Sequence, residues 1–337
     1  MVLQLLGAKI NSQSKKIKVA VIGHGHLGRW HAEKVEQNPL SQLYAIIEAD
    51  PSRAADIKQK YPDTIISSSI DEVIEDIDAA LVITPTSTHY KIVKKLLKHQ
   101  IHIFCEKPLC SSYEQAKELR ELYQEKNVIF QVGHSERFHH IWRTINQNSY
   151  YKKFLDEVGT LRVSRLAPFK GRATDVDVVQ DLMVHDIDLL VFLFGQIPKS
   201  VKSTGYKIRT SNWDYVCSEF LFEQGRRAIL TVGRNHVKEV REMEYTNKLG
   251  CMYIDMFQSE LLLAPNTEIP EKNKKISPFV EVLSYEKQDH LFVEQNHFYE
   301  SILNNGQSVV TIDDGVLAVK LISKVLESLE TGSEVLI

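Results

Sequence analysis

The first part of the chain alternates between short apolar runs and amphipathic stretches. Five runs are short, rich in β-branched residues and apolar on both faces, as buried parallel strands are: 17–22, 42–48, 79–83, 101–105 and 128–132. A short strand or turn is predicted at 67–70, and helical stretches lie between the runs at 29–37, 71–75, 90–99 and 111–126. This alternation predicts an α/β domain with a doubly wound parallel sheet over residues 15–135.

The pattern changes after Gly133. A helix is predicted at 140–151, and helices at 179–194, 289–304 and 313–330 follow, the last capped by Asp313 or Asp314. Seven strand-like stretches fill most of the remainder: 160–166, 200–206, 215–222, 227–232, 242–247, 251–255 and 259–264. Meandering strands favour an open, mostly antiparallel sheet. Residues 136–337 are therefore expected to form an α+β domain for substrate binding and oligomerisation, with an exposed loop at 265–275 and the last helices covering the sheet or returning to the first domain.

Composition narrows the class of protein. The 337 residues are enough for two domains, and a net charge of −3 argues against a nucleic-acid partner. No apolar run approaches the ~20 residues that cross a bilayer, and residues 1–14 lack the features of a signal peptide, so we expect an extension that is disordered or packs on a partner. The 4 cysteines are scattered, which indicates reduced thiols in a cytoplasmic protein without a metal site.

The first strand leads into a glycine-rich turn with a defined spacing, Gly23-His24-Gly25-His26-Leu27-Gly28, and a helix follows. Strand, G-x-G-x-x-G and helix together are the dinucleotide-binding fingerprint of the Rossmann fold. Gly23 makes the tight turn, Gly25 lets the backbone approach a pyrophosphate, and Gly28 allows close packing of helix and strand. The helix N-terminus attracts the phosphates. The alternative is a tight turn that merely contains three glycines.

An acidic residue ends the second strand. Glu48 lies about twenty residues past the glycines, where a carboxylate can accept hydrogen bonds from the adenosine ribose. No lysine or arginine follows at once, so a 2′-phosphate would meet negative charge, and NAD is favoured over NADP. Asp50 is the rival ribose ligand, although Asp50-Pro51 also reads as a helix N-cap.

Two later strands also end in polar segments, at the sheet edge where parallel sheets hold ligands. The first segment contains the cofactor candidates Thr84, Pro85, Thr86 and His89, with a plain helix cap as the alternative reading. The second is Glu106-Lys107-Pro108, whose lysine could polarise a carbonyl or hydroxyl beside a nicotinamide. A surface lysine in a strand-end turn is the alternative there.

The second domain offers an acid and a base on one helix. Asp181 and His185 are four residues apart and share a face, so the carboxylate can orient the imidazole as a general base. The alternative is an Asp–His pair that satisfies itself on a helix surface. Lys170 and Arg172, in a basic loop, could hold a phosphate or carboxylate of a substrate, or be solvated surface.

These motifs occur in an order that resembles the Gfo/Idh/MocA family of NAD(P)-dependent oxidoreductases. The resemblance rests on G-x-G-x-x-G followed by His31, T-P-x-x-x-H at 84–89, E-K-P at 106–108 and D-x-x-x-H at 181–185, and spans about 15–331. It implies that Lys107 lies near the nicotinamide and the reacting carbon. It also implies that Asp181 and His185 complete the site, with His185 as the acid/base.

Two longer stretches are similar to a subgroup of that family, the UDP-N-acetylglucosamine 3-dehydrogenases. They are VGHSERF at 132–138 and DVVQDLMVHDID at 177–188. The likeness implies NAD-dependent oxidation of the sugar 3-hydroxyl to a ketone, feeding an aminotransferase in amino-sugar, lipid A or surface-glycan synthesis. Arg137 and Phe138 then join Lys170, Arg172, Asp181 and His185 as substrate-binding candidates. His139-His140 departs from the subgroup's Asn-Pro at this point.

Other functions remain open from the sequence. The same enzyme class includes UDP-N-acetylglucosaminuronate 3-dehydrogenases and dehydrogenases of free sugars or inositol. A different class would be an NAD-binding sensor without turnover, although a pure binding protein would not need Lys107, Asp181 and His185. An open sheet with one face not covered by helices favours a homodimer or homotetramer through the C-terminal sheet.

Overall fold

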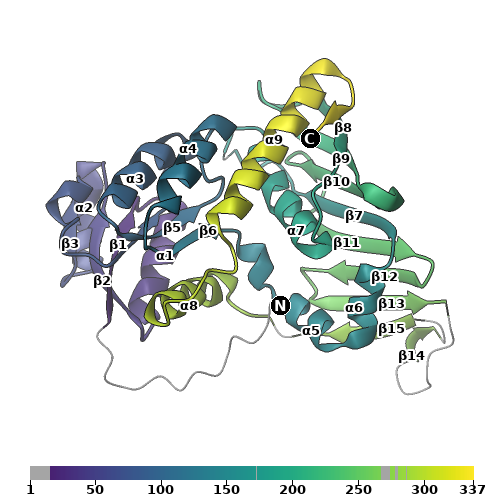
Figure 1. Cartoon of the computed structure of the whole chain (residues 1–337), viewed down its shortest axis with the longest axis horizontal. Helices are drawn as coiled ribbons and strands as arrows, with labels where there is room; N and C mark the ends of the chain where they lie inside the picture. The colour runs from purple at the N-terminus through teal and green to yellow at the C-terminus, as the bar shows by residue number, and fades with distance from the viewer. Residues whose placement is uncertain (1–15, 172, 267–273, 278–279, 286) are drawn as a thin grey trace. The chain divides into compact units, whose positions relative to one another are not determined.

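The computed structural model describes residues 16–171, 173–266, 274–277, 280–285 and 287–337. These residues form two compact units. Unit 1 contains 16–135 and Asp289–Val319, and unit 2 contains Glu136–Gln288 and Lys320–Ile337. Each unit has its own sheet (Figure 1). No helix in the part of the chain that the structure describes has the length and apolar character needed to cross a membrane.

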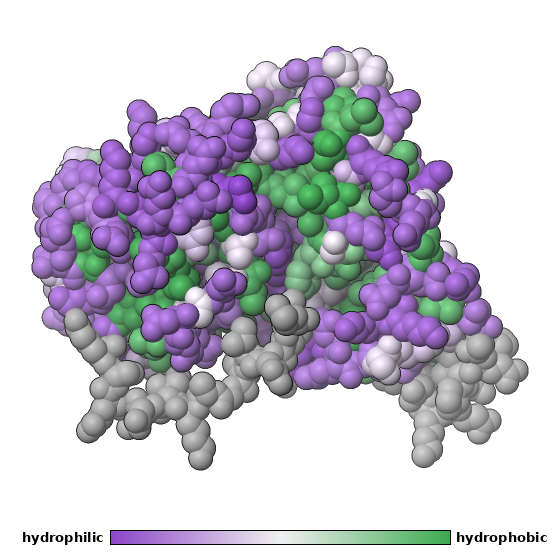
Figure 2. All heavy atoms as spheres, in the orientation of Figure 1, coloured by the Kyte–Doolittle hydropathy of each residue, from purple (hydrophilic) through white to green (hydrophobic). Residues whose placement is uncertain are grey.

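Unit 1 is the predicted doubly wound parallel sheet. Its six strands lie in the order β3-β2-β1-β4-β5-β6, and every neighbouring pair is parallel. The strands are β1 (Ile17–Ile22), β2 (Ser41–Ile47), β3 (Ile65–Ser67), β4 (Ala79–Val82), β5 (His102–Glu106) and β6 (Phe130–Gly133). The main helices are α1 (His26–Gln37), α2 (Ala54–Lys60), α3 (Thr86–Lys98), α4 (Tyr113–Gln124) and α8 (His290–Leu303). Hydrophilic residues cover most of this unit's face in Figure 2.

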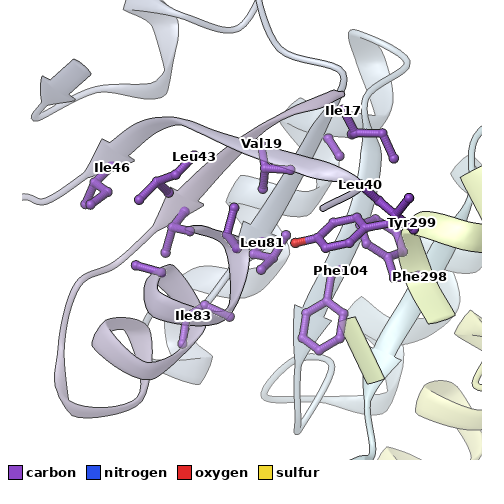
Figure 3. Close-up of a cluster of buried hydrophobic side chains, with 14 of the residues drawn as sticks. Ile17, Val19, Leu40, Leu43, Ile46, Leu81, Ile83, Phe104, Phe298 and Tyr299 are labelled. Atoms are coloured by element: carbon purple, nitrogen blue, oxygen red, sulfur yellow. The ribbon is translucent and has the colours of Figure 1, made fainter. Parts of the chain in front are cut away.

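The core of unit 1 combines residues from distant parts of the sequence. Val19 and Leu81, on neighbouring strands, are fully buried together with Phe104 of β5 (Figure 3). Phe298 and Tyr299 of α8 belong to the same cluster, and neither is exposed. Helix α8 thus returns to the first unit, one of the two arrangements expected from the sequence.

Unit 2 carries the expected open, mostly antiparallel sheet. Over the described part of this unit, ten strands lie in the order β14-β15-β13-β12-β11-β7-β10-β9-β8-β16, and only β7 and β10 are parallel neighbours. They are β7 (Gly159–Leu166), β8 (Ser200–Tyr206), β9 (Tyr215–Leu221), β10 (Arg227–Gly233), β11 (Val240–Asn247), β12 (Gly250–Asp255), β13 (Glu260–Pro265), β14 (Lys274–Ser277), β15 (Val280–Ser284) and β16 (Val335–Leu336). The last three were not predicted, and β14 takes up the end of the expected 265–275 loop, of which 267–273 lie outside the described residues.

Helices pack on one face of this sheet. They are α5 (His140–Gln147), α6 (Ser149–Asp156) and α7 (Val184–Phe194), and α9 (Ile312–Thr331) begins in unit 1 and ends in unit 2. Phe154 of α6 and Phe194 of α7 both pack their rings against Tyr245 of β11, with centroids 6.4 and 5.8 Å apart. The alternation of buried and more exposed residues along β7 and β9 shows that, among the described residues, this face is the buried one.

Three helix predictions need correction. The helix expected at 140–151 is interrupted because the Asn148 side chain accepts the N–H groups of Tyr150 and Tyr151 and starts a new helix. The helix expected at 71–75 is only a 3₁₀ turn, Ile70–Glu72, followed by a turn. Helix α9 is capped by Thr311, whose hydroxyl faces the Asp314 N–H while Asp314 accepts the Thr311 N–H, a reciprocal capping box.

Candidate active site

The glycine turn after β1 has the geometry of a phosphate cradle. Gly23 has a φ of +91°, and a Cβ there would lie 2.6 Å from the Ile83 carbonyl oxygen. A Cβ on Gly28 would lie 2.0 Å from the Gly23 oxygen, whereas one on Gly25 would meet nothing within 4 Å. The space over Gly25 is therefore open. Helix α1 begins next to it at His26, with no side-chain cap and no acidic residue in its first turn.

Glu48 follows β2 and lies beside this turn. Its carboxylate accepts the His24 N–H at 3.2 Å and the Asp50 N–H at 3.1 Å, and pairs with Arg53 at 3.0 Å. Asp50 instead accepts the Ser52 N–H and caps the turn Pro51–Arg53, the alternative noted from the sequence. Of the two acids, Glu48 is the one in contact with the glycine turn. His24 is buried, and burial, followed by the nearby Arg53 charge, lowers its pKa.

The polar segment after β4 is tied to the segment after β5. Pro85 precedes α3, which begins at Thr86, and provides no side-chain cap. The imidazole of His89 is buried, with Nε2 at 2.8 Å from the Thr84 carbonyl oxygen and Nδ1 at 3.0 Å from that of Pro108. Burial lowers the pKa of His89 although both carbonyls oppose this. His89 therefore links the two loops.

The E-K-P turn begins with a fixed carboxylate. Glu106 is the last residue of β5, and its two oxygens face His31 Nε2 at 3.0 Å and the Lys107 N–H at 3.1 Å. Burial would raise the pKa of Glu106, but the hydrogen bond from His31 and nearby positive charge outweigh it and lower the pKa. Lys107 is half-buried, and its peptide bond to Pro108 is cis.

All the cofactor candidates from the sequence thus follow strands of one parallel sheet at their carboxyl ends. They are Gly23, His24, Gly25, His26, Leu27, Gly28, Glu48, Thr84, Pro85, Thr86, His89, Glu106 and Lys107. An open cradle at a helix N-terminus, with a carboxylate at the next strand end, suits a pyrophosphate and an adenosine ribose. These residues fit NAD.

In unit 2 the acid and base candidates lie at an irregular point of a helix. The expected helix over 179–194 begins with a π-helical segment, Val179–Met183, before α7 continues. Asp181 belongs to the π segment and His185 to the first turn of α7, and both are half-buried. Asp177 fixes the start by accepting the N–H groups of the next two helical residues. Such π segments are frequent at functional sites.

Asp181 lines a cavity of about 310 Å³ in unit 2. Four cations line it as well, among them Lys170 from the predicted basic loop. The full lining is Arg165, Leu166, Ala167, Pro168, Phe169, Lys170, Asp181, Leu182, Arg234, Glu239, Val240, Arg241 and Phe257. Arg172, the other basic candidate, lies outside the described residues. Aromatic side chains beside a few polar groups are typical of small-molecule sites.

Each of the four cations has a carboxylate partner. The pairs are Arg165 with Asp186 at 2.6 Å, Arg234 with Asp214 at 2.7 Å, Arg241 with Glu136, and Lys170 with Glu239. The Arg165 and Arg234 pairs are buried. Arg241 is 32% exposed although its partner Glu136 is buried, whereas Lys170 and Glu239 are about half exposed. The cavity is therefore polar without a large excess of positive charge.

Two buried ion pairs fasten α7. Asp186, next to His185, accepts hydrogen bonds from both Nε and Nη2 of Arg165 on β7. Asp188, one turn on, accepts the corresponding nitrogens of Arg137 at 2.8 and 2.6 Å. Arg137 is expected from the sequence to contact substrate, and it directs these two donors to α7. Phe138, the other substrate candidate of this segment, is the last residue of the 3₁₀ turn Ser135–Phe138. All four charged side chains are under 10% exposed.

Sequence reasoning missed this role of Arg165, although a signal was present. Leu161, Val163 and Arg165 alternate along β7, and all three are buried. A period of two therefore placed an arginine on the core face, where a buried cation needs a carboxylate partner. Asp186 of the H-D-I-D run is that partner.

Comparison with known proteins identifies the family. The model "Oxidoreductase family, NAD-binding Rossmann fold" matches residues 17–134, and "GFO/IDH/MocA C-terminal domain" matches 158–246. UDP-N-acetylglucosamine 3-dehydrogenase of Acidithiobacillus ferrooxidans is 32% identical over 227 residues, 67% of this chain and 70% of that protein. The chain belongs to the Gfo/Idh/MocA family.

Two further comparisons cover more of the length of this chain. The NAD⁺-dependent scyllo-inositol 2-dehydrogenase of Bacillus subtilis is 25% identical over 342 residues, 95% of this chain and 96% of its own. A solved structure of the A. ferrooxidans 3-dehydrogenase aligns with a TM-score of 0.84 at 26% identity, covering 94% of this chain and 99% of that one. The predictions of an oxidoreductase acting on CH–OH groups and of NAD as cofactor are thereby confirmed.

Proposed function

We propose that this Gfo/Idh/MocA protein oxidises the 3-hydroxyl of UDP-N-acetylglucosamine to a ketone with NAD. The observation that carries the proposal is the cavity lined by Asp181, because its lining brings a carboxylate, paired cations and aromatic side chains to a space of about 310 Å³, which suits a sugar ring. The nucleotide part is supported by the 32% identity to a UDP-N-acetylglucosamine 3-dehydrogenase over two thirds of the chain. The product would feed an aminotransferase in amino-sugar, lipid A or surface-glycan synthesis.

Unit 1 holds the cofactor in this proposal. The open space over Gly25 and the α1 N-terminus receive the pyrophosphate, and Glu48 accepts hydrogen bonds from the adenosine ribose. The segments at Thr84–His89 and Glu106–Lys107 flank the nicotinamide end. Bound NAD supplies a hydride acceptor.

The proton chemistry is assigned to three side chains. His185 takes the hydroxyl proton, and Asp181, four residues earlier, orients the imidazole and stabilises its charged form. Lys107 donates a hydrogen bond to the same oxygen as negative charge develops on it. The ion pairs through Asp186 and Asp188 keep the backbone of His185 in place.

The charge balance of the cavity favours a neutral sugar ring over a uronate. A carboxylated sugar needs an additional cation, and each cation lining the cavity already has a carboxylate partner. The ion pair of Lys170 with Glu239 is weaker than the other three, because both side chains are exposed to solvent. Lys170 can therefore leave Glu239 to bind an anionic group of the substrate. We assign Lys170, with Arg172, to the diphosphate, and Arg137 to positioning α7.

The test is NADH formation from UDP-N-acetylglucosamine, followed by absorbance, beside its uronate, the free sugar and scyllo-inositol. Lys107→Met and His185→Ala should lose turnover, whereas the exposed-residue controls Lys91→Met and His99→Ala should keep it. An aminotransferase added as a trap removes the keto product if the equilibrium is unfavourable. Preference for the uronate would change the substrate, unchanged rates in both variants would refute the roles, and NADH binding without turnover would indicate a sensor.

We also propose a cytoplasmic homodimer or homotetramer formed through the face of the unit 2 sheet without helices. One row crosses eight strands in register on that face: Val282, Leu262, Tyr253, Glu244, Arg162, Ile229, Glu219 and Lys202. Its apolar members are half-buried, and charges of both signs occur along it. Light scattering after size exclusion tests the proposal, and a monomer at micromolar concentration refutes it.

A further inference from the structure

A buried chain of hydrogen bonds ends at the E-K-P turn. Glu106 Oε1 lies 3.0 Å from His31 Nε2, His31 Nδ1 lies 2.9 Å from Gln295 Nε2, and Gln295 Oε1 lies 3.2 Å from the Tyr299 hydroxyl. His31, Gln295 and Tyr299 have no exposed surface, and Glu106 is 7% exposed. The chain joins α1, β5 and α8, three elements of unit 1.

The direction of each hydrogen bond follows from the partners. The Gln295 amide nitrogen also lies 3.3 Å from the His31 carbonyl oxygen, which can only accept. The amide nitrogen therefore faces His31, and the Tyr299 hydroxyl donates to the amide oxygen. His31 Nδ1 is then the acceptor, so the imidazole proton is on Nε2 and is donated to Glu106. An imidazolium would set its Nδ1–H against the amide N–H.

The Glu106 carboxylate is held from further directions. Its second oxygen accepts the Lys107 backbone N–H at 3.1 Å. On the neighbouring strand β6, a Cβ at Gly133 would lie 2.8 Å from Oε1, so the carboxylate occupies space that only glycine leaves free. The backbone of Lys107 is thus tied to a carboxylate whose position depends on His31.

We propose that His31 and Gln295 are positioning residues for the dehydrogenase reaction. They hold Glu106, Glu106 holds the Lys107 amide, and this aims the lysine that donates to the reacting oxygen. The role of Lys107 rests on the proposed function, whereas the hold on its amide does not. Through Gln295, helix α8 helps to position Lys107, although it lies far along the sequence from the glycine turn.

Removing the His31 hydrogen-bond donor should therefore lower the rate of sugar oxidation more than it weakens binding of the cofactor. In His31→Leu the buried carboxylate loses the imidazole donor of His31 and shifts, and a displacement of about 1 Å can cost about 10²-fold in rate. We expect kcat to fall at least about tenfold, while the Kd for NADH changes less than about threefold. The reason is that, within the part of the protein that the structure describes, no side-chain hydrogen bond joins the glycine turn or Glu48 to His31, Gln295 or Glu106. His31→Gln retains one donor and one acceptor and should recover most of the rate.

The decisive measurement needs no substrate. Hydrogen exchange of the Lys107 backbone amide, followed by mass spectrometry of the whole protein after digestion, reports whether Glu106 still accepts that N–H. Relative to the wild type, we expect the Lys107 amide to exchange about tenfold faster or more in His31→Leu and to accelerate less in Gln295→Leu. In His31→Gln the exchange rate should return to that of the wild type. Phe298→Leu is the control, because Phe298 packs on Phe104 in the same core without joining the chain (Figure 3).

The outcomes separate this proposal from the proposed function. Unchanged Lys107 exchange in His31→Leu, or equal acceleration in Phe298→Leu, would overturn the hold on Lys107. Faster exchange with unchanged kcat would overturn the positioning role. If the wild type oxidises no sugar, the proposed function fails, and the exchange data still decide whether His31 and Gln295 hold the turn.

Discussion

The guanidinium of Arg53 lies 3.0 Å from the Glu48 carboxylate, so the acid expected at the adenosine ribose already has a cation beside it. Arg53 comes five residues after Glu48 and is about 40% exposed. The sequence interpretation considered only the residues directly after Glu48, which include no cation. The turn Pro51–Arg53, capped by Asp50, returns the arginine to the acid.

This contact predicts how the cofactor preference responds to mutation. Glu48→Ala removes the charge that repels a 2′-phosphate and leaves Arg53 to bind it. We expect the ratio of kcat/KM for NAD to that for NADP to fall at least about tenfold, or about 1.4 kcal/mol. Arg53→Ala in the same background should reverse the gain with NADP. An unchanged ratio in Glu48→Ala would show that Glu48 does not face the ribose.

The ion pairs under α7 predict a large stability effect. Asp186→Asn leaves Arg165 buried with weaker compensation, and breaking such a pair costs about 3–5 kcal/mol. The midpoint of denaturant unfolding should fall accordingly. The exposed pair of Lys199 and Glu223 is the control, since Glu223→Gln should leave the midpoint unchanged within error. Similar midpoints for the two variants would contradict the assigned role of Asp186.

A buried histidine predicts acid sensitivity of unit 1. Burial lowers the pKa of His297 to about 4, and its Nε2 accepts the Val309 N–H, which requires the neutral ring. The stabilisation is therefore complete above the unfolded pKa of 6.5 and is lost as pH falls from there toward about 4. The loss should be about 3 kcal/mol. In His297→Gln, which keeps an acceptor, the free energy of unfolding should fall less over the same range, whereas equal slopes would contradict the assignment.

The sequence was sufficient for features with local causes. The alternation of apolar runs and helices gave both sheet types, because buried parallel strands and half-exposed antiparallel strands have different patterns. The position of Glu48 beside the Gly23–Gly28 turn also follows from the sequence, since their spacing reflects the local path of one β–α–β unit, while their contact with the cofactor stays a prediction.

Features that depend on distant partners were missed. Nothing near His31 in the sequence indicates that Gln295 fixes its tautomer, because the two residues meet only when α8 packs beside α1. Likewise the sequence does not indicate that Asp188 accepts two of the donors of Arg137, and a substrate contact of Arg137 stays a prediction. A cation's role depends on whether the fold supplies it with a carboxylate.

Two glycines of the turn, Gly25 and Gly28, predict opposite effects on folding and binding. Gly25 has a φ of −69° and a ψ of −157°, an extended conformation without a positive φ, and a Cβ there meets nothing within 4 Å. Gly25→Ala should therefore melt like the wild type without cofactor. The new methyl group would occupy the space assigned to the pyrophosphate, so the Kd for NADH should rise at least about tenfold, with a corresponding loss of the melting shift that NADH produces.

Gly28→Ala is the matched contrast, because its Cβ would lie 2.0 Å from the Gly23 oxygen. The backbone must move to relieve that contact, so this variant should melt at a lower temperature even without cofactor. Melting curves of both variants with and without NADH separate the two cases. If Gly25→Ala melts early, the space over Gly25 is needed for folding. If it binds NADH as the wild type does, the pyrophosphate lies elsewhere, and the assignment of the cradle is wrong.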